Sequence, residues 1–72
     1  MFHRGLMKPD EKGLLNAVQA KPRSLSVRAV VQKLGIHEER AAAILIKWVN
    51  KGWYEYEVYI DLGWLTEEGK NK

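Results

Sequence analysis

Residues 34–53, LGIHEERAAAILIKWVNKGW, contain the helix on which the fold of this 72-residue chain depends. Gly35 can adopt the left-handed conformation that ends a preceding helix, and Gly52 stops the run that follows. Between the two glycines, acidic residues come first and lysines come last, which is the order that a helix dipole favours. Apolar side chains recur at helical spacing and form one stripe, namely Ala41, Ile44, Leu45 and Trp48. The segment therefore predicts an amphipathic helix that begins near His37.

Two further helices are predicted before this segment. Pro9 suits the first turn of a helix, and the acidic residues that follow it favour the same place. That helix runs to about Ala20, because Pro22 disfavours a helical conformation at the residue before it. Ser26 is a good N-cap for a second helix over residues 27–34, which carries an apolar stripe of its own. The chain thus predicts three helices in succession.

After Gly52 the apolar pattern changes from helical to alternating. Residues 53–60 are rich in β-branched and aromatic side chains, so they predict a strand. The run IDLG predicts a turn, and WLT predicts a short return strand. Because a lone hairpin is unstable in water, we expect it to pack on the helices through a face that carries Tyr54, Tyr56 and Val58. The predicted fold class is α+β, a three-helix bundle with a C-terminal two-stranded β-hairpin.

Length and composition predict one small folded domain. The chain is 46% hydrophobic and 29% charged, which is typical of a folded soluble protein. We expect the domain to cover residues 9–69, with an N-terminal tail at residues 1–8 and a C-terminal tail at residues 70–72. The absence of cysteine favours a cytoplasmic protein, and no apolar run is long enough to enter a membrane as a span.

Charge is distributed unevenly along the chain. Residues 1–52 hold ten Lys or Arg and four Asp or Glu, a balance of +6, whereas residues 53–69 hold five acidic residues and no basic one. A basic body attracts a polyanion, and an acidic C-terminal third repels one. Any nucleic-acid partner is therefore expected to approach the helices rather than the hairpin.

Three motifs occur in order along the chain: SVRAVVQKLGI, HEERAAAILIKWVNKGW and WLTEEGK. Their order and spacing resemble those of winged helix-turn-helix domains, above all the MarR-like regulators and related small bacterial and archaeal winged-helix proteins. The resemblance covers roughly residues 9–69. It implies that the third helix lies in the DNA major groove and that the hairpin is a wing against the DNA. It also implies a small transcriptional regulator that contacts double-stranded DNA through helices two and three.

The residues available for DNA contact are polar or basic: Arg28, Lys33, His37, Arg40, Lys47, Asn50 and Lys51. The centre of the third helix suits base readout poorly, because Ala42 and Ala43 carry no group that can hydrogen-bond to a base. The hairpin tip, residues 59–63, is apolar and acidic, whereas a wing that binds phosphate is usually basic. We therefore expect contacts to the DNA backbone to outweigh base recognition.

The competing hypothesis is a protein-interaction module, which includes a homodimer. Its candidate interface combines the outer face of the third helix with hairpin aromatics: Ala43, Ile46, Val49, Tyr59 and Trp64. A simpler reading of Trp53, Tyr59 and Trp64 is that they pack against one another across the hairpin.

Enzymatic activity is not expected. The sequence offers no evident pairing of a nucleophile with a base, no glycine-rich phosphate loop and no cluster of metal-ligand type. We accordingly predict no catalytic residue, no cofactor and no metal ion.

Overall fold

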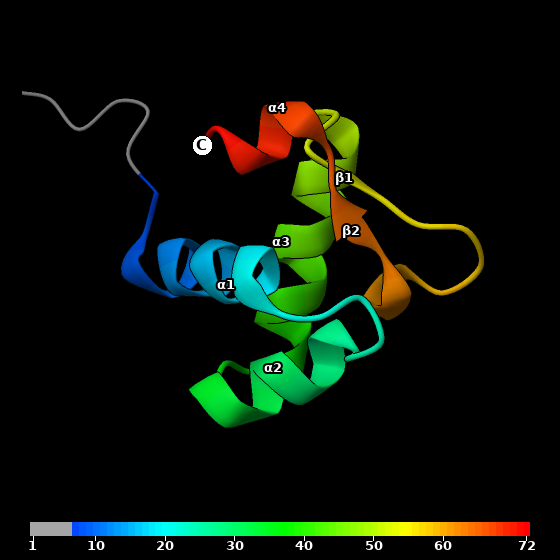
Figure 1. The fold of residues 1–72 in the computed structure, drawn as a ribbon. Helices are drawn as coiled ribbons and strands as arrows, with labels where there is room; N and C mark the ends of the chain where they lie inside the picture. The colour runs from blue at the N-terminus through cyan, green and yellow to red at the C-terminus, as the bar shows by residue number, and fades with distance from the viewer. Residues whose placement is uncertain (1–6) are drawn as a thin grey trace, which may run out of the picture.

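A computed structural model describes residues 7–72, so the predicted tail at residues 1–8 lies outside the described residues except for Met7 and Lys8. The elements follow one another in the order α1 (Pro9–Ala20), α2 (Val27–Leu34), α3 (Glu38–Asn50), β1 (Tyr54–Glu55), η1 (Ile60–Leu62), β2 (Trp64–Leu65) and α4 (Glu67–Lys70) (Figure 1). Here η1 is a single turn of 3-10 helix. The predicted α+β class, with helices first and a small antiparallel sheet after them, is confirmed.

The helix boundaries follow from local hydrogen bonds and backbone conformation. The Ser26 hydroxyl accepts a hydrogen bond from the amide N of Ala29 at 3.2 Å and caps α2. Gly35 adopts φ +72° and ends that helix, as predicted. His37 caps α3 by accepting from the amide N of Glu39 through Nδ1 at 3.2 Å. Gly52 takes φ +78° in the turn that leads from α3 to β1.

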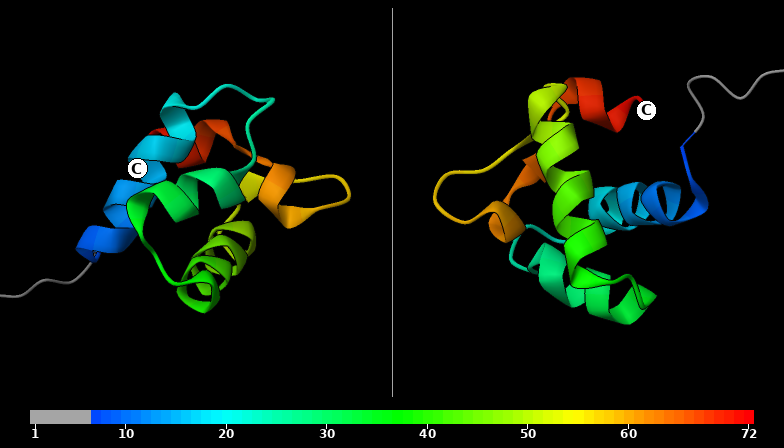
Figure 2. Two further views of the ribbon diagram at one scale, coloured as in Figure 1. Left: turned by 90° about the horizontal axis from the view of Figure 1, so that it is seen from below. Right: turned by 180° about the vertical axis from the view of Figure 1, so that it is seen from behind.

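The hydrophobic core lies where the first three helices meet the sheet. The stripe predicted for α3 is buried, and Trp48 at its C-terminal end is fully covered. The other buried apolar side chains are Leu14, Leu15 and Val18 of α1, Val27, Val30 and Val31 of α2, Tyr54 of β1 and Leu65 of β2. The right-hand view in Figure 2 places α3 between α1 on one side and the connection from β1 to β2 on the other.

The hairpin is shorter than the alternating pattern predicts. Tyr54 lies opposite Leu65 and Glu55 opposite Trp64, and the chain leaves the sheet after that pair. Tyr56 and Val58 are therefore 41% and 74% exposed, so the prediction that they pack on the helices was wrong.

The Tyr54 hydroxyl accounts for the short hairpin. It donates to the carbonyl O of Ile60 at 2.6 Å and accepts from the amide N of Gly63 at 3.0 Å, so it joins both ends of η1. Burial raises the pKa of Tyr54 to about 12, because the phenolate would lose its hydration. A Cβ on Gly63 would overlap the carbonyl oxygen of Glu55, so a close approach of the two chain segments is built into the hairpin.

The short helix α4 was not predicted. Thr66 caps it by accepting from the amide N of Gly69 at 3.1 Å and anchors it by donating to the carbonyl O of Gly52 at 2.7 Å. Lys70 therefore belongs to a helix, whereas the sequence placed it in a C-terminal tail. Within residues 7–72 none of the helices combines the length and the apolar character that crossing a bilayer requires.

Candidate functional site

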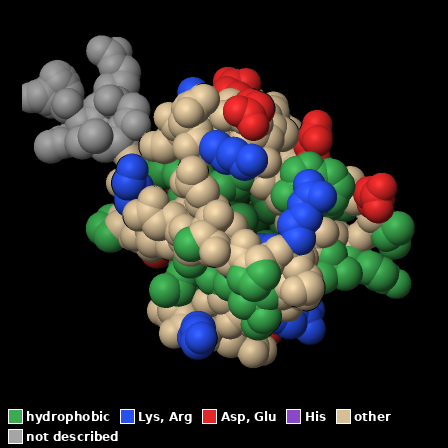
Figure 3. All heavy atoms as spheres, in the orientation of Figure 1, with side chains coloured by type: hydrophobic (Ala, Val, Ile, Leu, Met, Phe, Trp, Pro, Cys, Tyr) green, Lys and Arg blue, Asp and Glu red, His purple; other side chains and the backbone are tan. Residues whose placement is uncertain are grey.

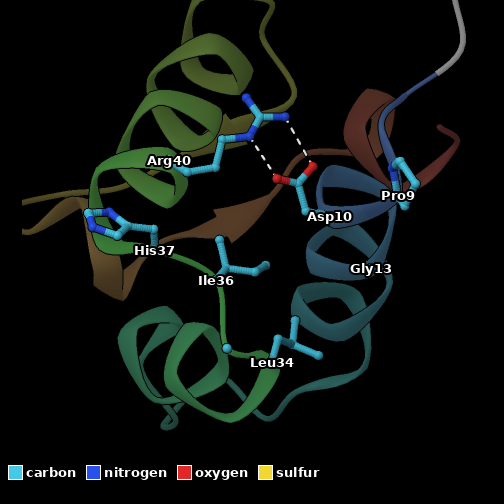
Figure 4. Close-up of a pocket in the computed structure, with 8 residues that line it drawn as sticks. Pro9, Asp10, Gly13, Leu34, Ile36, His37 and Arg40 are labelled. Atoms are coloured by element: carbon cyan, nitrogen blue, oxygen red, sulfur yellow. Dashed lines mark hydrogen bonds and ion pairs between the residues drawn. The ribbon is translucent and has the colours of Figure 1, made fainter.

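Arg40, a predicted DNA contact, is paired with α1, while about a third of its side chain remains exposed. Its Nε and Nη2 donate to the Asp10 carboxylate at 2.7 and 3.1 Å, a two-point ion pair that Figure 4 shows beside His37 and Ile36. The hydrogen bond from Arg40 holds the pKa of Asp10 below its usual value. The positive charge of Arg40 is thus offset within the fold.

Lys47, a second predicted contact, is also paired with α1. Its Nζ donates to Glu11 Oε1 at 2.9 Å, while Trp48 Nε1 donates to Glu11 Oε2 at 2.8 Å. Glu11 is only 2% exposed, whereas the Lys47 side chain is about half exposed. The lysine therefore presents its outer part to solvent above a buried carboxylate.

Lys47 and three further lysines line one hollow of about 780 Å³. We call it the lysine hollow, and its lining residues are Met7, Glu11, Lys12, Lys47, Lys51, Trp53 and Lys72. Four lysines against one glutamate give the lining a net charge of +3. The carboxylate of Glu68 approaches from the rim, 3.9 Å from Lys72 Nζ.

Trp53 lies among these ammonium groups. The Nζ atoms of Lys51 and Lys72 are 5.2 and 5.3 Å from the centre of its ring, and the side chain is half-buried. Such cation–π contacts hold the two lysines near the hollow rather than extended into solvent. The site thus combines several positive charges with one accessible aromatic ring.

The opposite flank of α3 carries a groove of different chemistry, about 550 Å³ in volume. We call it the apolar groove, and α2, α3 and the connection from β1 to β2 line it with Val27, Arg28, Val31, Glu38, Ala41, Ala42, Leu45, Ile46, Tyr56, Val58, Tyr59, Ile60 and Asp61. Figure 3 shows hydrophobic side chains in green standing out where that connection lies, with acidic side chains in red beside them.

The remaining predicted DNA contacts are dispersed. Arg28 and Lys33 are exposed on α2, and Asn50 is exposed on α3. His37 uses Nδ1 to cap its own helix, so a single ring nitrogen remains for another partner. Lys47 and Lys51 line the lysine hollow, His37 and Arg40 line the pocket of Figure 4, and Arg28 lines the apolar groove, so the seven predicted residues share no single hollow.

The predicted protein interface is divided as well. Ile46 and Tyr59 line the apolar groove, whereas Val49 is half-buried against the core. Ala43 is exposed on α3 but does not line the groove. Trp64 lies opposite Glu55 in the sheet and under the Arg23 guanidinium, 4.5 Å from its ring centre. The aromatic packing expected of Trp64 across the hairpin is replaced by this contact.

The lysine hollow could not be predicted from the sequence, because residues far apart in the chain form it. Lys12 and Lys72 are sixty residues apart in the sequence, yet Lys12 Nζ donates to the carbonyl O of Lys72 at 3.5 Å. The unpredicted helix α4 returns the chain end to α1 and brings the two together. The excess of basic residues in the first 52 positions was the one available signal.

No family model, no curated protein and no solved structure matches this chain.

Proposed function

We propose that the chain is a small winged-helix protein that binds duplex DNA through phosphate contacts from the lysine hollow. The succession of three helices and a hairpin, with a turn at Gly35 between the second and third, supports the winged-helix assignment. The observation that carries the DNA assignment is the gathering of Lys12, Lys47, Lys51 and Lys72 around one hollow. Closely spaced lysines attract phosphates and release the counterions condensed on DNA.

The usual base-reading pose fits the surface of α3 less well. Its outward side chains are Glu39, Ala42, Ala43, Ile46 and Asn50, all exposed. One of these, Asn50, is a common partner for a base edge, whereas the alanines and the isoleucine offer no donor or acceptor. Glu38 and Asp61 in the adjoining groove add negative charge. Binding is therefore tolerant of DNA sequence, with dissociation constants of roughly 10⁻⁴ to 10⁻⁶ M at physiological salt.

The salt dependence of DNA binding tests this proposal. A fluorescein-labelled duplex of mixed sequence is titrated with protein between about 50 and 200 mM salt, and anisotropy gives the binding constant. Each lysine–phosphate contact contributes about 0.9 to the slope of log K against log salt. Lys12→Ala and Lys51→Ala are each expected to reduce that slope by about one unit.

The matched control is Lys33→Ala, which removes one exposed positive charge from α2 outside the lysine hollow. It is expected to leave the slope unchanged. The proposal is contradicted if the duplex does not bind at about 50 mM salt. A loss of slope in Lys33→Ala without one in Lys51→Ala equally contradicts it, because DNA would then contact α2 instead.

A second function, protein recognition, is favoured by one separate observation. The apolar groove exposes several large hydrophobic side chains on the flank of α3 that faces away from the lysine hollow. Because the two surfaces share no lining residue, binding at one leaves the other free.

A further inference from the structure

We infer that the apolar groove binds a basic amphipathic helix of another protein. Seven large hydrophobic side chains are exposed within residues 7–72, and four of them line this single groove. These four are Ile46 at 52%, Tyr56 at 41%, Val58 at 74% and Tyr59 at 64% exposure. A concentration of exposed apolar side chains at one place marks a binding surface more strongly than scattered ones do.

The walls of the groove suit a helix. Val27 and Val31 of α2 form one wall, and Ala42 and Ile46 of α3 form another. Two packed helices leave between their side-chain ridges a channel into which the ridge of a third helix fits. A bound helix satisfies its own backbone hydrogen bonds, so it can bury an apolar stripe at positions i, i+3, i+4 and i+7 against such walls.

The connection from β1 to β2 forms the third wall of the groove, and the base of this wall is held in place within the protein itself. Tyr54 bonds to both Ile60 and Gly63, and Ile60 packs against the core. Val58 and Tyr59 project from this anchored base. A surface whose backbone is already positioned loses less conformational entropy when it binds.

The charges around the groove select a basic partner. Its lining contains one basic residue, Arg28, and two acidic residues, Glu38 and Asp61. The connection from β1 to β2 also carries Glu57, which is exposed. With Glu57 included the net charge of this surface is −2, so two copies facing each other repel, as DNA would be repelled, whereas lysines or arginines flanking an apolar stripe are attracted.

Two labelled peptides test the inference. Each is an amphipathic helix of about 14 residues, or four turns, with leucine at the i, i+3, i+4 and i+7 positions. One carries lysine at the remaining positions and the other carries glutamate. At about 150 mM salt, where only charges within about 8 Å of each other still interact strongly, the lysine peptide is expected to bind with at least about tenfold higher affinity in fluorescence anisotropy.

Substitutions in the apolar groove test whether the lysine peptide binds there. Ile46→Ser and Val58→Ser are each expected to lower the affinity for the lysine peptide about tenfold, because each removes an apolar side chain that anchors the peptide. Both side chains are more than half exposed, so their loss leaves the core intact. The matched control is Leu25→Ser, since Leu25 is 41% exposed and lies outside the groove. Lys51→Ala, which weakens DNA binding, is expected to leave peptide affinity unchanged.

Three results would overturn the inference. The first is equal binding, or no binding, of the two peptides. The second is a lysine peptide whose affinity does not respond to Val58→Ser. The third is a dimer in light scattering that Val58→Ser abolishes, because a second copy would then occupy the groove. None of these results bears on DNA binding at the lysine hollow, so the two proposals fail independently.

Discussion

Glu11 is buried in α1, and its two carboxylate oxygens accept from Lys47 Nζ and Trp48 Nε1. The indole N–H of a fully buried tryptophan needs an acceptor, and Glu11 supplies it. The same carboxylate holds Lys47 at the wall of the lysine hollow. One residue thus stabilises the core and positions a candidate phosphate contact.

Removal of the Glu11 carboxylate should destabilise the protein. Glu11→Ala leaves the Trp48 N–H without its acceptor, so we expect a loss of about 2–3 kcal/mol in the free energy of unfolding in urea. Asn16→Ala, on the exposed surface of the same helix, is the control and should change that free energy by less than about 0.5 kcal/mol. Equal stabilities of the two variants would show that the buried network contributes nothing.

Asp10 and Arg40 make stability depend on pH. The folded state holds the pKa of Asp10 below its usual value of 3.8, chiefly through the hydrogen bond from Arg40. A carboxyl group with a depressed pKa stabilises the fold above its unfolded pKa, and that contribution disappears as pH falls through the folded pKa. The stability difference between wild type and Asp10→Asn should therefore be constant above about pH 5 and shrink as pH falls below the unfolded pKa of 3.8.

Urea unfolding at several pH values measures this difference. Glu38→Gln is the control for the loss of one negative charge, because Glu38 takes part in none of the ion pairs found within residues 7–72. A difference between wild type and Asp10→Asn that stays constant down to about pH 2 would mean that the Arg40 contact does not stabilise the carboxylate.

At the scale of elements, α4 depends on a glycine. A Cβ on Gly69 would overlap the carbonyl oxygen of Trp53, whereas a Cβ on Gly13 of α1 meets nothing within 4 Å. Thr66 adds a backbone hydrogen bond to the same Trp53 oxygen at 2.8 Å. The close approach of α4 to the segment before β1 thus requires a residue without a side chain at position 69.

Substitution by alanine should change the free energy of unfolding in opposite directions at Gly69 and Gly13. Gly69→Ala forces α4 away from Trp53 and is expected to reduce the free energy of unfolding by about 1–3 kcal/mol. Gly13→Ala keeps the helix and lowers the entropy of the unfolded chain, so a gain of roughly 0.5–1 kcal/mol is expected. Thermal unfolding of both variants measures the effect. A neutral Gly69→Ala would mean that α4 is not packed as described.

The elements whose limits are set locally were predictable, and those set by distant contacts were not. Ser26 and Gly35 mark their helix ends in the sequence because capping involves neighbouring residues. The alternation through Tyr56 and Val58 predicted a longer strand, but the chain leaves the sheet where the Tyr54 hydroxyl donates to Ile60 and accepts from Gly63. Such a bond depends on tertiary position, which alternation does not encode.

In the candidate site too, features set by the local sequence were predictable and features set by distant contacts were not. That the centre of α3 has few side chains able to hydrogen-bond to a base was evident from its alanines. The pairing of Arg40 with Asp10, thirty residues earlier, was not evident from the sequence. The proximity of Lys12 and Lys72 was not evident either. Charge counts along the chain gave the sign of the basic surface, and only the meeting of α1, the end of α3 and Lys72 around one hollow gave its place.

Across the whole molecule, α3 separates two surfaces of opposite character. The flank toward α1 carries the lysine hollow with a lining charge of +3, and the other flank carries the apolar groove with its acidic surroundings. A polyanion and a basic helix could therefore be bound together without competing.

The most direct test of this account is a map of where duplex DNA touches the protein. Amide and indole N–H signals are followed by NMR as a short duplex of mixed sequence is added at low salt. DNA binding at the lysine hollow predicts the largest chemical-shift changes at Lys12, Lys51 and the Trp53 indole. The signals of the α3 residues Ala42 and Ile46 should change little. Shifts concentrated on Ala42 and Ile46 instead would place DNA in the apolar groove and contradict it.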